Sequence, residues 1–521
     1  MREQRMAKRS ISRPGEAGKW AAFLGCLFLF VSGGQAQEVG GLDVGRISDL
    51  DLNALRTIID EQGSIQEPGT VGFRALSLES AVKTALEENL GLQIFAVDVA
   101  SSERQIDVSK SKFHPVAAIG GEATGTRRNE SNPALQDQSS DRQEAQVVLT
   151  QEVPTGGDVS FGVGYAREFR NEVVTDSGNN NFNQTNLNEI AGLGIEISQP
   201  LLRGGRTYVA RQKILDARYD TEVRRAELKS EVLRVTAETK AAYYQVIGAH
   251  RQIEVVEQAL VRDGELIRAS SALFDAGRVS KVDLFSAEIS QSNDRARLAT
   301  SQANLEVAQN SLRKVIGLPV NVEVEVTDTT IPFWPIRMNL RGWIERAIDM
   351  RPELLALQNE RAKIELAVKV RKNEKLPGLD VKGGFFPGFD WKSYNYNAGL
   401  SFDYPLGNAA AKGRLDQARL AQDKIRHEIA RAKRDIELEV REIEIRLRES
   451  LARVENLTAA VTSAREKREI ARGRFEMGLA NNLDITNADQ ELVRAETLLL
   501  EALVDYATNV ALLESRIGGE L

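Results

Sequence analysis

Few residues in this sequence of 521 are arranged as catalysis or metal binding would require. The three histidines, His114, His250 and His427, are far apart in the chain and give no indication of a metal site. The sequence contains no phosphate-binding loop of the Walker type, no G-x-S-x-G segment and no H-E-x-x-H segment. Most carboxylates lie among Lys and Arg, as in EVREIEIRLRES, which is typical of solvated helix faces. We therefore expect neither an enzyme nor a bound cofactor.

Two segments place an aspartate at the same spacing after a glycine. FDAGRVSKVDLFSA (274–287) and FEMGLANNLDITNA (475–488) share the pattern Phe-x-x-Gly-x5-Asp-x3-Ala. Each pattern predicts a tight turn at the glycine followed by a helix, so the simplest role of the aspartate is to cap that helix. The shared residues are Gly277 and Gly478, and Asp283 and Asp484.

The two segments belong to a longer internal repeat. Upstream, LSLESAVKTALEENLGL (76–92) parallels MNLRGWIERAIDMRPEL (338–354) at an offset of 262 residues. Each copy also has a proline on either side of its strand-like region: Pro115 and Pro200 in the first copy, Pro377 and Pro405 in the second. The offset is 262 residues between Pro115 and Pro377 but 205 residues between Pro200 and Pro405. This difference predicts an insertion of about 57 residues in the first copy. We interpret the chain as a tandem duplication.

These offsets define the expected domain organisation. A signal peptide (1–36) and an N-terminal extension (37–75) precede a first repeat (76–319), an inter-repeat linker (320–337) and a second repeat (338–518). Each repeat is expected to contain a helix, then strands, then a long helical hairpin. The strands are expected at about 115–200 and 377–405, and the hairpins at about 207–316 and 411–517.

The N-terminus has the features of a secretory signal peptide. Basic residues are followed by the apolar run WAAFLGCLFLFV (20–31) and by small residues that end at Ala36. The only cysteine, Cys26, lies inside the run, so lipidation of Cys26 is an alternative interpretation. Residues 1–36 carry +4 of a total charge of −7, so cleavage leaves a mature chain at −11 without cysteine. This charge disfavours nucleic acid as a partner, and disulfides and thiol catalysis are excluded.

Two long segments combine the absence of proline with a heptad pattern. No proline occurs from 201 to 318 or from 406 to 521. Within 228–260 and 436–461, apolar or small residues recur at spacings of four and three, which predicts left-handed coiled-coil packing. A helix over 208–274 would be about 100 Å long. A coiled-coil rod is the plainer interpretation, but the signal peptide and the strands argue against it.

Several other segments alternate apolar with polar or small residues, as strands with one apolar face do. They are 145–149, 159–165, 191–197, 379–385 and 394–404. The tight turn PTGG (154–157) lies between two long polar connections, at about 127–142 and 170–187. This arrangement favours an outer-membrane β-barrel over a soluble sheet. About four strands in the first copy and two in the second are too few to close a barrel, so we expect a homo-oligomer with a shared barrel.

Together with ISQPLLRGGR (197–206) and FDYPLGNAAAKGR (402–414), these features resemble the TolC-like outer-membrane factors over about 76–518. The resemblance implies a mixed α+β membrane protein: a trimer whose shared transmembrane β-barrel continues into a coiled-coil α-helical barrel in the periplasm. It implies a passive exit duct of a tripartite efflux pump or type I secretion system. The implied partners are a periplasmic adaptor, an inner-membrane transporter of the RND, ABC or similar type, and outer-membrane lipid. The alternative is a structural coiled-coil protein anchored in the outer membrane, without a transport role.

The first copy departs from the family pattern of two strands per repeat. QEVPTGGDVSFGVGYARE (151–168) indicates an added hairpin, at about 143–168. If it joins the barrel wall, a trimer has about eighteen strands instead of twelve. We favour the larger barrel.

The resemblance also implies a gate at the periplasmic helix tips, formed by the turns at Gly277 and Gly478. Aligned on Gly478, the first aperture aspartate of the family falls on Asp484, whereas the second is replaced by Asn487. The latch arginine is replaced by Ala480, so the family's polar latch is not intact here. The alignment also places the aromatic partner of the latch arginine on Phe475 and the neighbouring acidic partner on Asp283. Arg278, in the turn of the first copy, is the candidate for a substitute charge. An acidic ring at Asp484 would favour cations, and this role is the alternative to simple capping.

Overall fold

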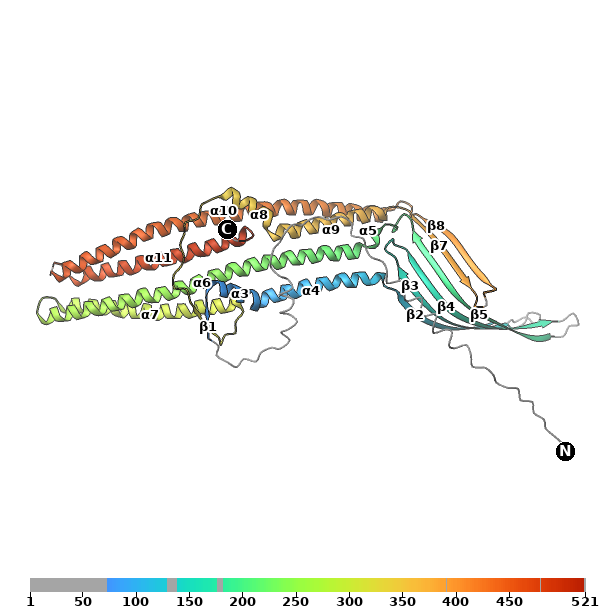
Figure 1. The fold of residues 1–521 in the computed structure, drawn as a ribbon, viewed down its shortest axis with the longest axis horizontal. Helices are drawn as coiled ribbons and strands as arrows, with labels where there is room; N and C mark the ends of the chain where they lie inside the picture. Colours follow the sequence, from blue (N-terminus) through green and yellow to red (C-terminus); the bar gives the residue numbers. More distant parts are fainter. Residues whose placement is uncertain (1–72, 129–137, 176–180, 390, 478, 520–521) are drawn as a thin grey trace, which may run out of the picture. The chain divides into compact units, whose positions relative to one another are not determined.

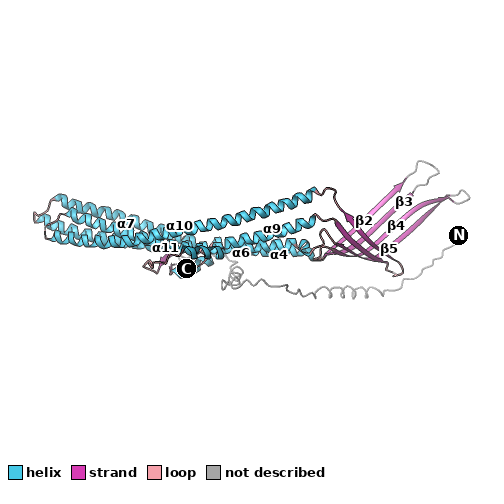
Figure 2. Ribbon diagram, turned by 90° about the horizontal axis from the view of Figure 1, so that it is seen from above, coloured by secondary structure: helices cyan, strands magenta, loops and turns pink. Residues whose placement is uncertain are grey.

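The computed structural model describes residues 73–128, 138–175, 181–389, 391–477 and 479–519 (Figure 1). The expected signal peptide, nearly all of the N-terminal extension and Gly478 lie outside these residues. The described chain consists of long helices with an antiparallel sheet at one end of them, as Figures 1 and 2 show.

The longest helices are α6 (Gln212–Asp275) and α10 (Ala409–Glu476), of 64 and 68 residues. Each turns back into a second helix, α7 (Lys281–Ile316) after α6 and α11 (Asn482–Arg516) after α10. Every position of the two heptad series is buried or half-buried. The predicted long helices and their inward faces are therefore confirmed, and the two hairpins pack side by side through α6 and α11.

A glycine sets the distance between these two helices at one level. Gly248 of α6 is buried against α11, and a Cβ added to it would lie 2.6 Å from Val504 Cγ2. No real Cβ makes such a contact, so the absence of a side chain permits the close approach of the two hairpins here.

Shorter helices pack beside the long ones (Figure 1). They are α3 (Leu78–Glu88), α4 (Leu90–Lys110), the 3-10 turn η1 (Ser111–Phe113), α5 (Thr207–Ala210), α8 (Leu340–Met350) and α9 (Pro352–Glu374). Helix α4 packs on α6, and α9 packs on both α6 and α10. Their starts follow local sequence: Asn89 Oδ1 accepts from Leu92 N–H at 3.1 Å, and Pro352 occupies the first turn of α9.

A parallel pair of short strands lies beside the helices. Strand β1 (Phe73–Leu76) pairs with β6 (Glu323–Val326), and both cover the core around Val235 and Tyr243. The Tyr243 hydroxyl lies 2.8 Å from Asp328 Oδ2 and 3.0 Å from the Leu76 carbonyl oxygen. Burial, with the hydrogen bond to Asp328, raises the pKa of Tyr243 to about 12, so this contact is made by a neutral phenol at any physiological pH.

The large sheet has six antiparallel strands in the order β2-β3-β4-β5-β7-β8. They are β2 (Val116–Arg128), β3 (Gln138–Glu152), β4 (Asp158–Thr175), β5 (Asn181–Pro200), β7 (Gly378–Pro387) and β8 (Tyr394–Asp403). The added hairpin of the first copy is part of this sheet, because β3 and β4 pair with each other and with β2 and β5 on either side.

Both of the predicted polar connections are shorter than expected. Pairing between β2 and β3 continues to Arg128 and Gln138, and pairing between β4 and β5 continues to Thr175 and Asn181. The prediction of loops over about 127–142 and 170–187 is wrong at these positions. Backbone hydrogen bonds can extend a hairpin beyond the region where one face is apolar, so side-chain polarity did not mark the strand ends.

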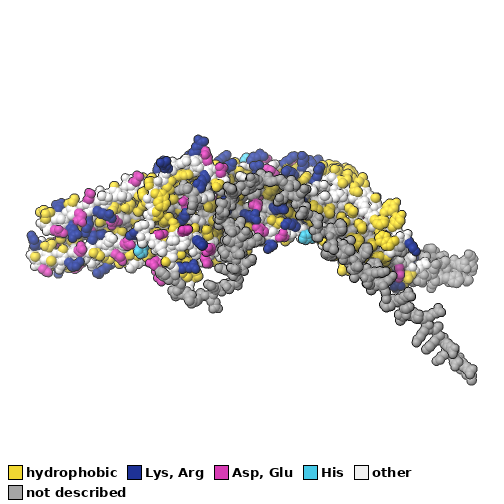
Figure 3. Space-filling view, viewed as in Figure 1, with side chains coloured by type: hydrophobic (Ala, Val, Ile, Leu, Met, Phe, Trp, Pro, Cys, Tyr) yellow, Lys and Arg dark blue, Asp and Glu magenta, His cyan; other side chains and the backbone are white. Residues whose placement is uncertain are grey.

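The pairing register gives the sheet one apolar face. Val147, Val163 and Leu193 are neighbours across β3, β4 and β5, and Val381 is opposite Leu400 in β7 and β8. Figure 3 shows hydrophobic side chains gathered over the sheet. The other face carries small and polar residues, among them Ser160, Gly162, Gly164, Gly192 and Gly194. Among the described residues, no helix is both long and apolar enough to cross a membrane.

Candidate functional site

The end of the first hairpin is a tight turn closed by reciprocal capping. Gly277 has φ 71°, in the left-handed region that favours glycine, and follows Ala276, the C-cap of α6. Ser280 is the N-cap of α7, and Asp283 Oδ2 accepts from the Ser280 amide at 3.0 Å and from its hydroxyl at 2.9 Å. Asp283 thus caps α7 from the third helical position. Arg278 is exposed and makes no ion pair with the described residues.

The end of the second hairpin is built the same way around a different N-cap. Asn481 Oδ1 accepts from the Asp484 amide at 3.0 Å, and Asp484 Oδ2 accepts from the Asn481 amide at 3.2 Å. The turn itself, at Gly478, lies outside the described residues. Asp484 and Asn487 are both exposed. Asp484 therefore combines a capping role with a charge that faces solvent.

The two hairpin ends are joined by an asparagine that the sequence did not single out. Asn482, at the start of α11, is fully buried, and its Nδ2 donates to Ser270 Oγ at 2.5 Å and to the Asp283 carbonyl oxygen at 3.0 Å. Its side chain thus links α11 to both helices of the first hairpin. Residues in the first turn of a helix are usually exposed to solvent, so the local sequence does not indicate that Asn482 is buried.

An apolar cluster closes the same junction. Phe475 of α10 is 7% exposed and packs with Leu266, Ala287 and Ile485, one from each of the other three helices. Ala480, at the position of the expected latch arginine, lies at the edge of this cluster. The described contacts between the hairpin ends are therefore apolar packing and the Asn482 hydrogen bonds.

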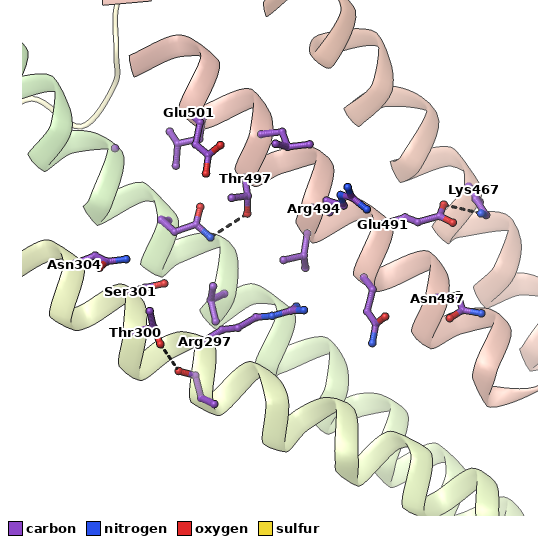
Figure 4. Close-up of a pocket in the computed structure, with 18 of the residues that line it drawn as sticks. Arg297, Thr300, Ser301, Asn304, Lys467, Asn487, Glu491, Arg494, Thr497 and Glu501 are labelled. Atoms are coloured by element: carbon purple, nitrogen blue, oxygen red, sulfur yellow. Dashed lines mark hydrogen bonds and ion pairs between the residues drawn. The ribbon is translucent and has the colours of Figure 1, made fainter. Parts of the chain in front are cut away.

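A groove of about 1270 Å³ runs between the hairpins, starting near their ends at Asp484, and is lined by α6, α7, α10 and α11. Asp484 and Asn487 line it, whereas Asp283 does not. Figure 4 shows Glu491 of α11 directed toward Lys467 of α10, with the polar residues Thr300 and Ser301 on α7 across the groove. The groove surface carries charges of both signs: Arg297, Lys467, Arg474 and Arg494, with Asp484, Glu491, Glu501 and Asp505.

Beside this groove, a charged cluster is buried among all four helices. Asp489 of α11 pairs with two guanidinium groups: its Oδ1 lies 3.1 Å from Arg262 Nε of α6 and 3.0 Å from Arg468 Nε of α10. Asp263 of α6 and Asp294 of α7 are the other members, at 4% and 5% exposure. Burial, followed by the charges of Asp294 and Asp489, raises the pKa of Asp263 to about 7, and a hydrogen bond with Ser290 opposes the change.

The sequence contained a signal for this cluster. Continued by the same spacings, the heptad series of α6 reaches Asp263 and Ser270, and that of α10 reaches Arg468 and Phe475. Charged residues at interior heptad positions indicate buried polar pairing. The apolar positions alone had defined the series, so the charged continuation was missed.

The four prolines lie where the helices meet the large sheet. Pro115 and Pro377 directly precede β2 and β7, Pro200 ends β5, and Pro405 follows β8. The segment after Pro200 is fixed by Asn373, a 3% exposed residue of α9. Asn373 Oδ1 accepts from the Gly204 amide at 2.8 Å, and its Nδ2 donates to the Leu202 carbonyl oxygen at 3.0 Å.

Replacement of Asn373 by alanine is expected to lower the free energy of unfolding by about 1–3 kcal/mol, since it leaves two half-buried backbone groups of the junction without their partner. Thermal unfolding in detergent measures the change. The control is Asn359→Ala on the same helix, which loses only a hydrogen bond to the Leu355 carbonyl within that helix. Equal losses of stability in both variants would contradict the assignment.

Comparison with known proteins gives one family. The family model described as "Outer membrane efflux protein" matches residues 174–318 and 343–519. The outer membrane efflux protein BepC of Brucella suis is 24% identical over 330 residues, 60% of this chain and 68% of that relative. The alkaline protease secretion protein AprF of Pseudomonas aeruginosa is 22% identical over 326 residues, 60% of this chain and 66% of that relative. The chain thus matches about two thirds of the length of these relatives.

The fold has solved counterparts. The structure of the outer-membrane channel OprN superimposes with a TM-score of 0.63 at 16% identity, over 85% of this chain and 90% of that one. At this identity the likeness is one of fold.

Proposed function

Because this chain belongs to the outer membrane efflux protein family, we propose that it is a passive exit duct of a tripartite efflux pump or a type I secretion system. The family places it in the outer membrane. The observation that carries the proposal is the union of one sheet, apolar on a single face, with two helical hairpins about 100 Å long. The sheet suits a membrane wall, and the hairpins suit a conduit that extends from it into the periplasm.

The duct requires several copies of the chain. Strand β2 pairs only with β3, and β8 only with β7, among the described residues, so both edges of the sheet are open. Open edges are not tolerated in lipid, because unpaired backbone groups are costly there. A homotrimer would close the six strands of each copy into a shared barrel of about eighteen strands. The tandem duplication and its domain boundaries remain part of this proposal, supported by the similar lengths of α6 and α10.

The proposed partners follow from a duct that has no energy source of its own. A periplasmic adaptor and an inner-membrane transporter of the RND, ABC or similar type would supply energy and cargo, and outer-membrane lipid would surround the sheet. One relative is named for efflux and another for protease secretion. We therefore propose export in general and assign no particular class of molecule as the cargo.

The proposed gate lies at the hairpin ends, where the groove faces the duct. Asp484 and Asn487 would line the aperture, with Phe475 and Asn482 holding the second hairpin against the first. Asp283, Arg278 and the turns at Gly277 and Gly478 would form the outer rim of the tips. The four prolines would mark the passage from barrel to helices.

Single-channel conductance in a planar bilayer tests both the duct and the gate. We expect a small cation-preferring conductance, and we expect Asp484→Ala to reduce the preference for cations because it removes the charge at the aperture. The matched control is Asp283→Ala, which deletes the equivalent capping carboxylate but no charge in the groove.

The two variants separate capping from constriction. An equal change in both variants would contradict the aperture role of Asp484 and support capping alone. No conductance from correctly assembled protein, including both variants, would favour the alternative of an outer-membrane scaffold without transport.

A further inference from the structure

The polar face of the large sheet carries a hollow of about 730 Å³ over strands β3, β4, β5 and β7. Its floor consists of glycines, because Gly162 pairs with Gly194, and Gly164 with Gly192, in neighbouring strands. Side chains alternate between the two faces along a strand, which places these four positions on the face opposite to that of Val163. The hollow therefore opens to the side that would be the lumen of the duct.

Phe386 of β7 lies on this floor with its ring against the backbone. Its neighbour Phe385 belongs to the apolar face, where its ring centroid is 5.9 Å from that of Tyr394. A Cβ added to Gly194 would lie 2.8 Å from Phe386 Cδ1, and one added to Gly384 would lie 2.7 Å from its Cε2. Two edges of the ring thus rest on β5 and β7, and only glycine at both positions leaves room for it.

A second apolar side chain borders the hollow. Ile190 of β5 lies on the same face as Gly194 and is 70% exposed, and Phe386 is half-buried. Both side chains would meet water in the lumen of the proposed duct. A ligand that covers them removes apolar surface from water, which is favourable in proportion to the area covered. Apolar and aromatic walls with a few polar groups are the usual composition of sites for small molecules.

The unpaired charge of the hollow is a carboxylate beside the ring. Glu196 is opposite Gly384 in the pairing of β5 with β7, is exposed and makes no ion pair with the described residues. Lys382, the preceding residue on this face of β7, does not line the hollow. The other carboxylates that line it are paired with arginines: Glu144 with Arg142, and Glu189 with Arg167. The hollow therefore combines an aromatic face with a negative charge, and both attract a cation.

We propose that this hollow, which we term the aromatic site (Phe386, Ile190, Glu196 and the four floor glycines), binds flat organic cations that pass through the barrel. The ring of the ligand would lie against Phe386 and Ile190, with its positive charge near Glu196. The floor glycines let Phe386 lie against the wall, so that the site takes up little of the lumen. The inference rests on the proposed function, since this face lines a lumen only if the sheets of several copies close into a duct.

Binding of ethidium, a flat fluorescent cation, to the full-length protein in detergent tests the site without any need for conductance. Phe386→Ala is expected to weaken binding about tenfold, because it removes the aromatic face. The matched control is Phe385→Ala, which deletes the neighbouring ring from the opposite face of the same strand and should bind as wild type does. Equal affinities of wild type and Phe386→Ala would overturn the proposal.

The carboxylate is tested in the same titration. Glu196→Gln should weaken ethidium binding about fivefold at low salt, because it removes the unpaired charge beside the ring. The control is Glu122→Gln, which removes a carboxylate from the same face of β2 outside the hollow and should leave the affinity unchanged. Equal weakening by the two variants would overturn the site and leave only a general attraction of cations to the lumen.

Conductance tests the floor of the site. Gly194→Ala places a Cβ 2.8 Å from Phe386 Cδ1, so the ring must leave the wall and enter the lumen, and the conductance should fall. Gly194→Ala combined with Phe386→Ala should restore it. A double variant that conducts as poorly as Gly194→Ala would overturn the seating of the ring.

The two measurements separate the site from the duct. Ethidium binding with the expected pattern, in assembled protein that does not conduct, would contradict the duct and retain the site. Conducting protein that does not bind ethidium would overturn the site and retain the duct.

Discussion

Replacement of Val163 by arginine is expected to prevent stable assembly of the protein in the outer membrane. Val163 lies on the apolar face of β4, between Val147 of β3 and Leu193 of β5. An arginine that faces lipid costs about 2–4 kcal/mol near the middle of the bilayer and less toward the interfaces. In the proposed trimer this cost arises three times, so the effect is large even if each side chain partly reaches the interface.

The control for this experiment lies on the same strand. Ala166 belongs to the polar face and is opposite Glu144 in the pairing of β4 with β3. Ala166→Arg therefore places the same charge in the proposed lumen, beside a carboxylate. The amount of assembled protein in isolated outer membranes is the measurement. Equal amounts of both variants would mean that the apolar face of the sheet does not contact lipid.

Replacement of Asp489 by alanine is expected to have the second large effect, a loss of about 3–5 kcal/mol in the free energy of unfolding of the helical region. Asp489 is the shared partner of Arg262 and Arg468, whose side chains are 14% and 17% exposed. Its removal leaves Arg262 without an anion and Arg468 with only the exposed Glu469, 3.5 Å away, and the cost of an unpaired buried charge exceeds the value of the pair itself.

The matched control is two residues further along α11. Glu491 pairs with Lys467 at 2.6 Å, but both side chains are more than half exposed. Because solvent screens such a pair, Glu491→Ala should change stability by no more than about 1 kcal/mol. Thermal unfolding of the two variants in detergent compares them directly. A loss in Asp489→Ala as small as that in Glu491→Ala would show that water enters the cluster readily.

The helices were predictable because their signals are long and regular. Heptad spacing over 228–260 and 436–461 identified inward faces that the structure confirms, among them Val235, Val440 and Leu447. The strands were predictable where one face is apolar, as in 159–165, because alternation then has a period of two. The family match also confirms the resemblance to outer-membrane factors.

The missed features depend on pairing in three dimensions. The ends of β2 to β5 extend into polar sequence, because backbone pairing needs no apolar side chains. The Asn482 contact joins residues about 200 apart in sequence, and no local pattern encodes its acceptors, Ser270 and the Asp283 carbonyl. Asp283 and Asp484 were predicted as caps, but their position is the third of the helix, since Ser280 and Asn481 are the N-caps.

The position of β7 in the sheet has a consequence for the biogenesis of the protein. Strands β2 to β5 are consecutive hairpin partners, but residues 195–200 of β5 pair with 380–385 of β7. The two partners lie 180–190 residues apart in the chain, with α6, α7, α8 and α9 between them. Until β7 pairs with it, the edge of β5 is open to pairing with another chain, and such long-range closure is slow. Aggregation therefore competes with completion of the sheet, and a periplasmic chaperone that covers a free strand edge would raise the yield of folded protein.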